Sequence, residues 1–150
     1  IWTEDKQPKQ TINAIYDSGT YTEKFERDLV EAEKTIVISS PNISQDKIER
    51  FLYLIKERQE EGVKVTVITT DPEEIIYGNS DICYELIREM EQIGINVITK
   101  TEVEERFAVI DNELVWHGGM NLLGKVDVWD NLMRIKSQEV AAELLEMSIG

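Results

Sequence analysis

Six polar or glycine positions in the last third of the chain have residue types and a spacing that could support chemistry. In chain order they are Glu104, Arg106, Asp111, Gly118, Gly119 and Asn121. One residue separates the acid from the base, four separate the base from the aspartate, and six separate the aspartate from the glycine pair. A guanidinium binds anions through charge-assisted hydrogen bonds, and glycines allow a backbone to approach another group closely. The chain thus places an arginine that could bind an anion beside an acid that could neutralise it.

The same spacing resembles the signature of the phospholipase D-like superfamily, His-x-Lys-x4-Asp-x6-Gly-Ser-x-Asn. Glu104 stands at the position of the histidine, Arg106 at that of the lysine and Gly119 at that of the serine. The aspartate, the first glycine and the asparagine of the signature are present. The resemblance implies that the scaffold is kept while the nucleophile is lost.

In that family a histidine attacks a phosphodiester and forms a phosphohistidine, the lysine and asparagine hold the phosphate oxygens, and the aspartate is expected to orient the imidazole. Two half-sites face each other, so this chain would supply one and a homodimer or a partner half-domain the other. The resemblance leaves no catalytic residue, only the vestigial positions Glu104, Arg106 and Asp111. The phosphate-binding candidates that it implies are Arg106, Gly118, Gly119 and Asn121.

Two of the changed or kept positions have an ordinary structural interpretation beside the functional one. On one strand, residues 104 and 106 point to the same face, so we expect Glu104 to pair with Arg106. A carboxylate there repels a bound phosphate by about 4 kcal/mol at an effective dielectric constant of about 20. The alternative is that Arg106 retains residual anion binding. Asp111 is either an acid that suits a hairpin turn or a vestige of the orienting role.

The residues around the glycine turn include the only histidine of the chain, His117, which is either structural or a relocated nucleophile. Trp116 and Trp129 flank the turn, and we expect them to be core or interface anchors rather than platforms for stacked bases. Asp127 and Asp130 follow the asparagine, and they would bind a divalent ion only with further ligands. The sequence predicts no metal site and no cofactor.

Composition limits the partners of the chain. Its 150 residues, 41% of them hydrophobic, suit one domain with its own core. A net charge of −14 repels nucleic acid and anionic membranes, and the last fifty residues hold four basic against ten acidic side chains. The single cysteine and the absence of a long apolar run predict a cytoplasmic protein with no membrane contact. The first residue, Ile1, suggests a piece of a longer chain.

Hydrophobic periodicity predicts alternating strands and helices. We expect strands over residues 12–16, 34–40, 63–69, 95–99, 106–110, 114–116 and 131–135. Helices are expected to start at Thr20 or Thr22, near Gln45, at Asn79 or Ser80 and after Ser137, with Gly62 and Gly94 ending the middle two. The prediction is an α/β fold: a mixed, largely parallel sheet with helices on both faces. It forms one phospholipase D-like half-domain over residues 12–150, after a polar tail or linker over residues 1–11.

The resemblance is greatest to half-domains on the C-terminal side of bacterial superfamily I helicases. The sequence thus predicts a degenerate, non-catalytic domain that serves assembly or nucleic-acid targeting in a larger helicase or ATPase. We expect a homodimer through the region from Arg106 to Trp129, and contact with nucleic acid only through the host. One alternative is an active phosphodiesterase, a nuclease completed by dimerisation, a partner or His117. The other is an unrelated α/β ligand-binding module.

Overall fold

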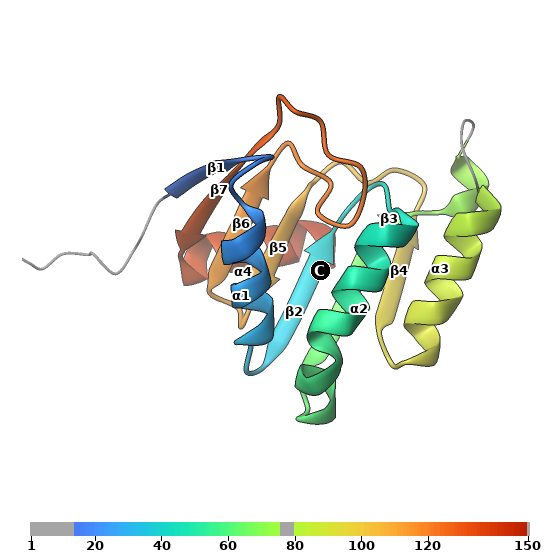
Figure 1. Ribbon diagram of the computed structural model, residues 1–150, viewed down its shortest axis with the longest axis horizontal. Coiled ribbons are helices and arrows are strands. Elements are labelled where there is room, and N and C mark those ends of the chain that lie inside the picture. The colour runs from blue at the N-terminus through green and yellow to red at the C-terminus, as the bar shows by residue number, and fades with distance from the viewer. Residues whose placement is uncertain (1–13, 76–79, 150) are drawn as a thin grey trace, which may run out of the picture.

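A seven-stranded sheet with helices on both faces forms the computed structural model, which describes residues 14–75 and 80–149 (Figure 1). The elements are β1 (Ala14–Asp17), α1 (Thr22–Val30), β2 (Thr35–Ser39), α2 (Gln45–Glu60), β3 (Lys64–Thr70), the 3-10 turn η3 (Pro72–Glu74), α3 (Ser80–Gln92), β4 (Asn96–Lys100), β5 (Phe107–Ile110), β6 (Leu114–Gly118), β7 (Asn131–Lys136) and α4 (Gln138–Ser148). The predicted tail over residues 1–11, the start of the first predicted strand and the Asn79 cap lie outside the described residues.

The strands follow the order β1-β7-β6-β5-β2-β3-β4. Only β2 with β3 and β3 with β4 pair in parallel, and the other four pairs are antiparallel. The prediction of a mixed α/β sheet is confirmed, but its description as largely parallel is wrong. The reason is that β5 turns back beside β2 and starts a run of antiparallel neighbours, and that β1 pairs with β7 at the far edge.

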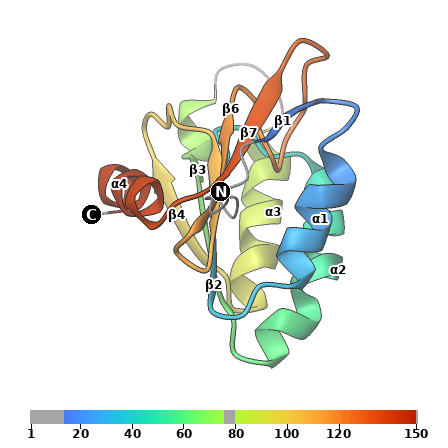
Figure 2. The same ribbon diagram turned by 90° about the vertical axis from the view of Figure 1, so that its left-hand side faces the viewer.

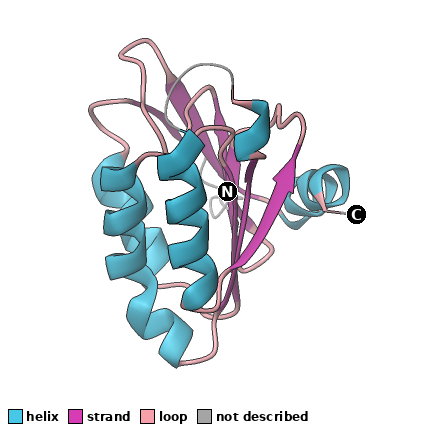
Figure 3. Ribbon diagram, turned by 90° about the vertical axis from the view of Figure 1, so that its right-hand side faces the viewer, coloured by secondary structure: helices cyan, strands magenta, loops and turns pink. Residues whose placement is uncertain are grey.

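Three helices, α1, α2 and α3, cover one face of the sheet, and α4 covers the other (Figures 2 and 3). The larger core lies under the three helices, and a smaller one lies under α4. Alternate residues of one strand serve the two cores: Ala108 and Ile110 face the three helices, whereas Phe107 and Val109 face α4. Burial on both faces explains why β2 and β5 are apolar almost throughout.

The helix boundaries follow local chemistry that the sequence largely predicts. Gly62 and Gly94 adopt φ values of 100° and 93° just after α2 and α3, a conformation that glycine tolerates without strain. The hydroxyl of Ser137 accepts the Val140 N–H at 3.1 Å and caps α4, as predicted. The predicted threonine cap of α1 is wrong, because the Thr20 hydroxyl donates to Asp17 at 3.0 Å instead.

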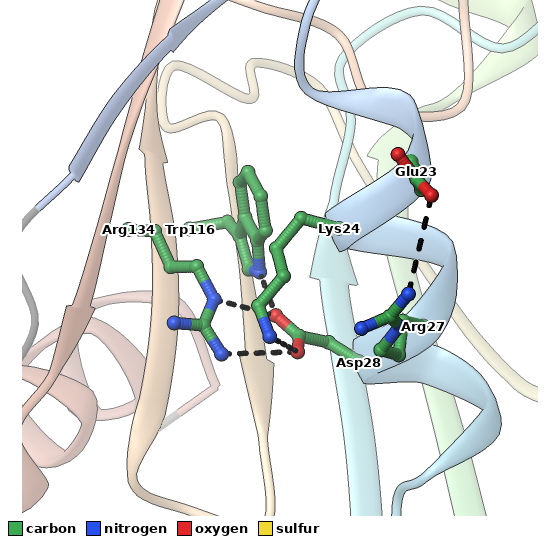
Figure 4. A network of polar contacts seen from close by, with 6 residues as sticks. All are labelled: Glu23, Lys24, Arg27, Asp28, Trp116 and Arg134. Carbon is green, nitrogen blue, oxygen red and sulfur yellow. Dashed lines mark hydrogen bonds and ion pairs between the residues drawn. The ribbon is translucent and has the colours of Figure 1, made fainter.

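A buried carboxylate joins α1 to the sheet (Figure 4). Asp28 accepts the indole N–H of Trp116 at 2.8 Å and two hydrogen bonds from the Arg134 guanidinium, at 2.8 and 3.0 Å. The Lys24 ammonium lies 3.9 Å from the same carboxylate. Trp116 is completely buried, so its predicted place on an exposed interface is wrong, whereas the core alternative is confirmed.

Candidate functional site

The motif residues other than Asp111 lie at the edge of the sheet where β2 and β6 end and β5 begins, the upper edge in Figure 1. Two hydrogen bonds fasten these segments together. The Ser39 hydroxyl donates to the Glu105 carbonyl at 2.7 Å, and the Gly118 N–H donates to the Arg106 carbonyl at 3.3 Å. The arginine and the glycine turn are therefore neighbours across two strands, as the motif spacing implies.

Arg106 is partly buried, and its Nε atom, although shielded from solvent, has no hydrogen-bond partner within residues 14–75 and 80–149. Among the described residues, no carboxylate lies within ion-pair distance of this guanidinium. The predicted Glu104–Arg106 pair is therefore absent. An unsatisfied buried donor costs about 1–3 kcal/mol, so an acceptor supplied by a ligand would relieve that cost.

Glu104 is exposed and belongs to a different environment. It lines a hollow of about 220 Å³ with Met147 and Ser148 of α4, a hollow that Arg106 does not line. A hydrogen bond with Glu102, followed by the charges of Glu102 and Glu105 and by desolvation, raises the pKa of Glu104. The same-face argument fails because residues 101–106 are irregular and the strand begins only at Phe107.

Asn121 is held in one orientation by a hydrogen bond to its side chain. It is buried, and its Oδ1 atom accepts the Asn42 N–H at 3.0 Å. Because the oxygen is engaged with the loop after β2, the orientation of the side-chain amide is set and its NH₂ group is left to donate. This is the geometry needed to hold an oxygen of a bound anion.

The two motif glycines serve close packing rather than an unusual backbone conformation. A Cβ atom on Gly118 would lie 2.9 Å from Cα of Leu132, so any side chain there would displace β7. A Cβ atom on Gly119 would lie 3.2 Å from the Asp130 carboxylate, which is tight but less severe. Positive φ values among the described glycines occur at Gly62 and Gly94 and not in this turn.

Asp111 lies at the opposite end of β5, in the β5–β6 hairpin. It has a φ of 57°, and its carboxylate accepts the backbone N–H groups of Glu33, Lys34 and Thr35 at 2.6–3.1 Å. Five residues of extended chain span about 16 Å, so this carboxylate cannot orient a group at position 104 or 106. Of the two interpretations of Asp111, the structure supports the turn acid, which here also anchors the loop between α1 and β2.

His117 points to the α4 side of the sheet, as its cross-strand partner Phe107 does. Its Nε2 atom lies 3.0 Å from Oε1 of Glu105, and the two side chains are 38% and 36% exposed. Gly118, the partner of Arg106, follows it and faces the other side. The structure thus does not bring His117 to the arginine, although a carboxylate does hold its ring.

Asp127 and Asp130 close the turn before β7. The Asp127 N–H donates to Asp130 Oδ2 at 3.1 Å, and the Trp129 N–H donates to Asp127 Oδ1 at 3.4 Å. Within residues 14–75 and 80–149, no group of three histidine, cysteine or acidic side chains is arranged to hold a metal ion.

No helix in those ranges is long and apolar enough to cross a membrane.

A cleft of about 630 Å³ opens beside Asn121, between the ends of β2 and β3, the start of α2 and the loop at residues 124–126. It contains two basic side chains, Lys47 and Lys125, one acid, Asp46, and the polar residues Asn42 and Ser44. These residues were not among the predicted site residues. The available signal was the position of Pro41-Asn42 directly after a buried strand, where polar residues gather at the edge of a sheet.

The family model described as "Cardiolipin synthase, PLD-like domain" matches residues 25–147. The chain belongs to the phospholipase D-like family. This excludes the alternative of an unrelated α/β module. No curated protein sequence matches the chain.

Solved structures share the fold of this chain at low sequence identity. Nuc from Salmonella typhimurium, a phospholipase D family member, is 16% identical with a TM-score of 0.71, over 91% of each chain. NucT from Helicobacter pylori is 14% identical with a TM-score of 0.63, over 92% of this chain and 93% of its own. TrmBL2, an archaeal chromatin protein, is 16% identical with a TM-score of 0.65, over 90% of this chain and 47% of its own. The fold of this phospholipase D-like domain thus occurs in proteins with different described roles.

Proposed function

We propose that this phospholipase D-like domain binds phosphate groups without cleaving them, and that it serves assembly or nucleic-acid targeting in a larger cytoplasmic protein of the helicase or ATPase type. The observation that carries the proposal is the residue at the first position of the motif, which is a glutamate. Glu104 replaces the histidine that the family uses, it is exposed, and its raised pKa results from other acids rather than from a catalytic partner. A carboxylate in that setting is a poor nucleophile towards an anionic phosphodiester.

The phosphate-binding part of the proposal rests on Arg106 and Asn121. The guanidinium has a buried Nε atom without a partner, and the asparagine amide is held in place through its oxygen. Charge-assisted hydrogen bonds to phosphate contribute about 1.5–3 kcal/mol each. The acidic net charge of −14 opposes a free polyanion, so binding of nucleic acid would require the host to bring it to this edge.

The role within a larger protein is supported by the way the fold is used elsewhere. TrmBL2, which shows a novel mode of DNA binding, contains this fold as about half of its chain, with 47% covered. In such a protein, a domain without its nucleophile can still bind the target and so bring the host protein to it. The helicase or ATPase chemistry would then belong entirely to the host.

The second candidate is an active phosphodiesterase with a relocated nucleophile. The observation that favours it is the 3.0 Å contact between His117 Nε2 and the Glu105 carboxylate, because a carboxylate that holds an imidazole is a common arrangement in nucleophilic catalysis. Against it stand the negative charge of Glu105 in contact with the ring and the charges of Glu102 and Glu104 on the same segment, all of which repel a phosphodiester.

Hydrolysis assays separate the two candidates. The purified chain is incubated with bis(p-nitrophenyl) phosphate and with single-stranded DNA, next to a His117→Ala variant prepared in the same way. The proposal predicts no turnover above buffer for either protein. Turnover by the wild type that disappears in His117→Ala would overturn it and establish the relocated nucleophile.

A further inference from the structure

Two loops from distant parts of the chain are fastened together at the motif edge, and both line the cleft of about 630 Å³. The Ser44 N–H donates to the Leu123 carbonyl at 2.9 Å, and the Leu123 N–H donates to the Ser40 hydroxyl at 3.2 Å. These bonds join the loop after β2 to the loop after β6, which descends beside the start of α2 in Figure 1. The hydrogen bond between Asn42 and Asn121 adds a third connection. The protein's own hydrogen bonds therefore shape this part of the cleft.

Gly124 allows the close approach of the two loops. A Cβ atom at this position would lie 2.5 Å from the Asn42 carbonyl oxygen and 3.3 Å from Cβ of Asn121. Any side chain there would push the loops apart. Because Gly124 itself lines the cleft, the asparagine of the motif is held directly beside it. The remaining substituents of an anion bound by Asn121 would thus lie next to the cleft.

The cleft has the size and the mixed lining of a site for an organic group. Its volume lies within the range of small-molecule sites, about 300–1,000 Å³. Pro41, Ile43 and Val126 supply apolar surface, whereas Asn42 and Thr70 supply an amide and a hydroxyl. A lipid acyl chain would leave such polar groups without partners, but a ring with polar edges would satisfy them. The lining therefore favours a base and a sugar over the tail of a lipid.

The charges of the cleft suit one anionic group and not a chain of them. Within the residues that the structure describes, no carboxylate lies within ion-pair distance of the exposed Lys125 ammonium. The second cation, Lys47, already donates to the Tyr21 hydroxyl at 3.0 Å. Asp46 also lines the cleft, and a hydrogen bond from Ser44 lowers the pKa of its carboxyl. A further phosphate inside the cleft would therefore meet a negative charge.

We propose that the cleft takes the nucleoside of a single nucleotide whose phosphate is held by Arg106 and Asn121, with Lys125 as a further cation on that phosphate. The inference rests on the phosphate binding proposed above and names the ligand class of that site. A free nucleotide and the phosphorylated end of a nucleic-acid strand share this chemistry.

Cys83, the only cysteine of the chain, lines the cleft and can report its occupancy. Alkylation of the whole chain by N-ethylmaleimide is followed with and without AMP, and calorimetry gives the Kd of AMP and of pyrophosphate. With AMP at about ten times its Kd, about one site in eleven stays open, so the alkylation rate should fall about tenfold. Pyrophosphate has no nucleoside and should bind with much less protection. Protection by an oligonucleotide with a 5′-phosphate would identify the strand end as a source of the nucleotide.

Lys125→Glu and Lys64→Glu form a matched pair of variants, because each changes the net charge by the same amount. Lys64 is exposed at the start of β3, whereas Thr70 at the end of that strand lines the cleft. Seven residues of strand place the two ends about 20 Å apart, beyond the Debye length at physiological salt. Lys125→Glu should weaken AMP binding at least about tenfold, and Lys64→Glu should change it less than about twofold.

Three results would overturn the inference. The first is AMP that binds without protecting Cys83, and loss of that binding in Trp129→Ala would place the base on this indole, which is 85% exposed. The second is an equal loss of affinity in Lys125→Glu and Lys64→Glu. The third is pyrophosphate binding without AMP binding, which leaves the proposed phosphate binding intact. Absence of binding by both ligands would overturn that proposed function as well.

Discussion

Two arginines on neighbouring parts of the sheet differ in whether the fold provides a hydrogen-bond partner for the guanidinium. Arg134 on β7 meets Asp28 through two hydrogen bonds of 2.8 and 3.0 Å, and Trp116 completes the set (Figure 4). Arg106, just before β5, keeps a buried Nε atom without an acceptor. Where a charge serves packing, the chain provides its partner from a helix 106 residues away. In the part of the chain that the structure describes, the arginine of the motif receives no such partner, which is the pattern expected of a group kept for a ligand.

The largest effect is expected from breaking the paired region. In Asp28→Asn the Arg134 guanidinium loses its counter-charge while nearly buried, and removal of one partner of a buried pair costs about 3–5 kcal/mol. Urea unfolding followed by tryptophan fluorescence measures the loss. Glu26→Gln is the matched control, because it removes a carboxylate from the same helix whose partner Arg50 is half exposed, and its cost should stay below about 1 kcal/mol. Equal losses in the two variants would contradict the special position of Asp28.

A smaller effect is expected at the hairpin anchor. Asp111→Asn keeps a residue that tolerates the φ of 57° but replaces a charged acceptor of three backbone N–H groups by a neutral one. The free energy of unfolding should fall by about 1–2 kcal/mol. Pyrophosphate binding should not change, because the residue lies at the far end of β5. A selective loss of pyrophosphate binding with unchanged stability would restore the motif role of this aspartate.

These two anchors show what could and could not be predicted from the sequence. The strands and the helix ends at Gly62 and Gly94 followed from local periodicity and local chemistry. The buried role of Asp28 could not be predicted, because an acid in a helix is normally solvated. Its partners come from β6 and β7, which are distant in the sequence. The Glu104–Arg106 pair failed because alternation was assumed where no strand exists. The resemblance named Arg106, Gly118, Gly119 and Asn121 as phosphate-binding candidates, but it gave no information on how the charge of Arg106 is satisfied.

The smallest effect concerns the acids beside the motif. Because its neighbours raise the pKa of Glu104 in the folded chain, the folded state binds protons more tightly than the unfolded chain does. Stability should therefore fall as the pH rises through the range just above the ordinary carboxyl pKa. Glu104→Gln should flatten this part of the pH profile of Tm and raise Tm slightly at neutral pH, and added salt should reduce the difference. Parallel pH profiles for wild type and variant would show that the acids do not interact.

The central claim is that Arg106 is free to bind a phosphate group, and a calorimetric titration with pyrophosphate at low and moderate salt tests it most directly. Wild type should bind, with weaker binding at the higher salt, and Arg106→Ala should lose at least about tenfold in affinity, since a charge-assisted hydrogen bond contributes about 1.5–3 kcal/mol. Glu104→Gln should bind nearly as wild type does, because that carboxylate does not pair with the arginine. Equal binding by wild type and Arg106→Ala, or binding that appears only in Glu104→Gln, would contradict the account.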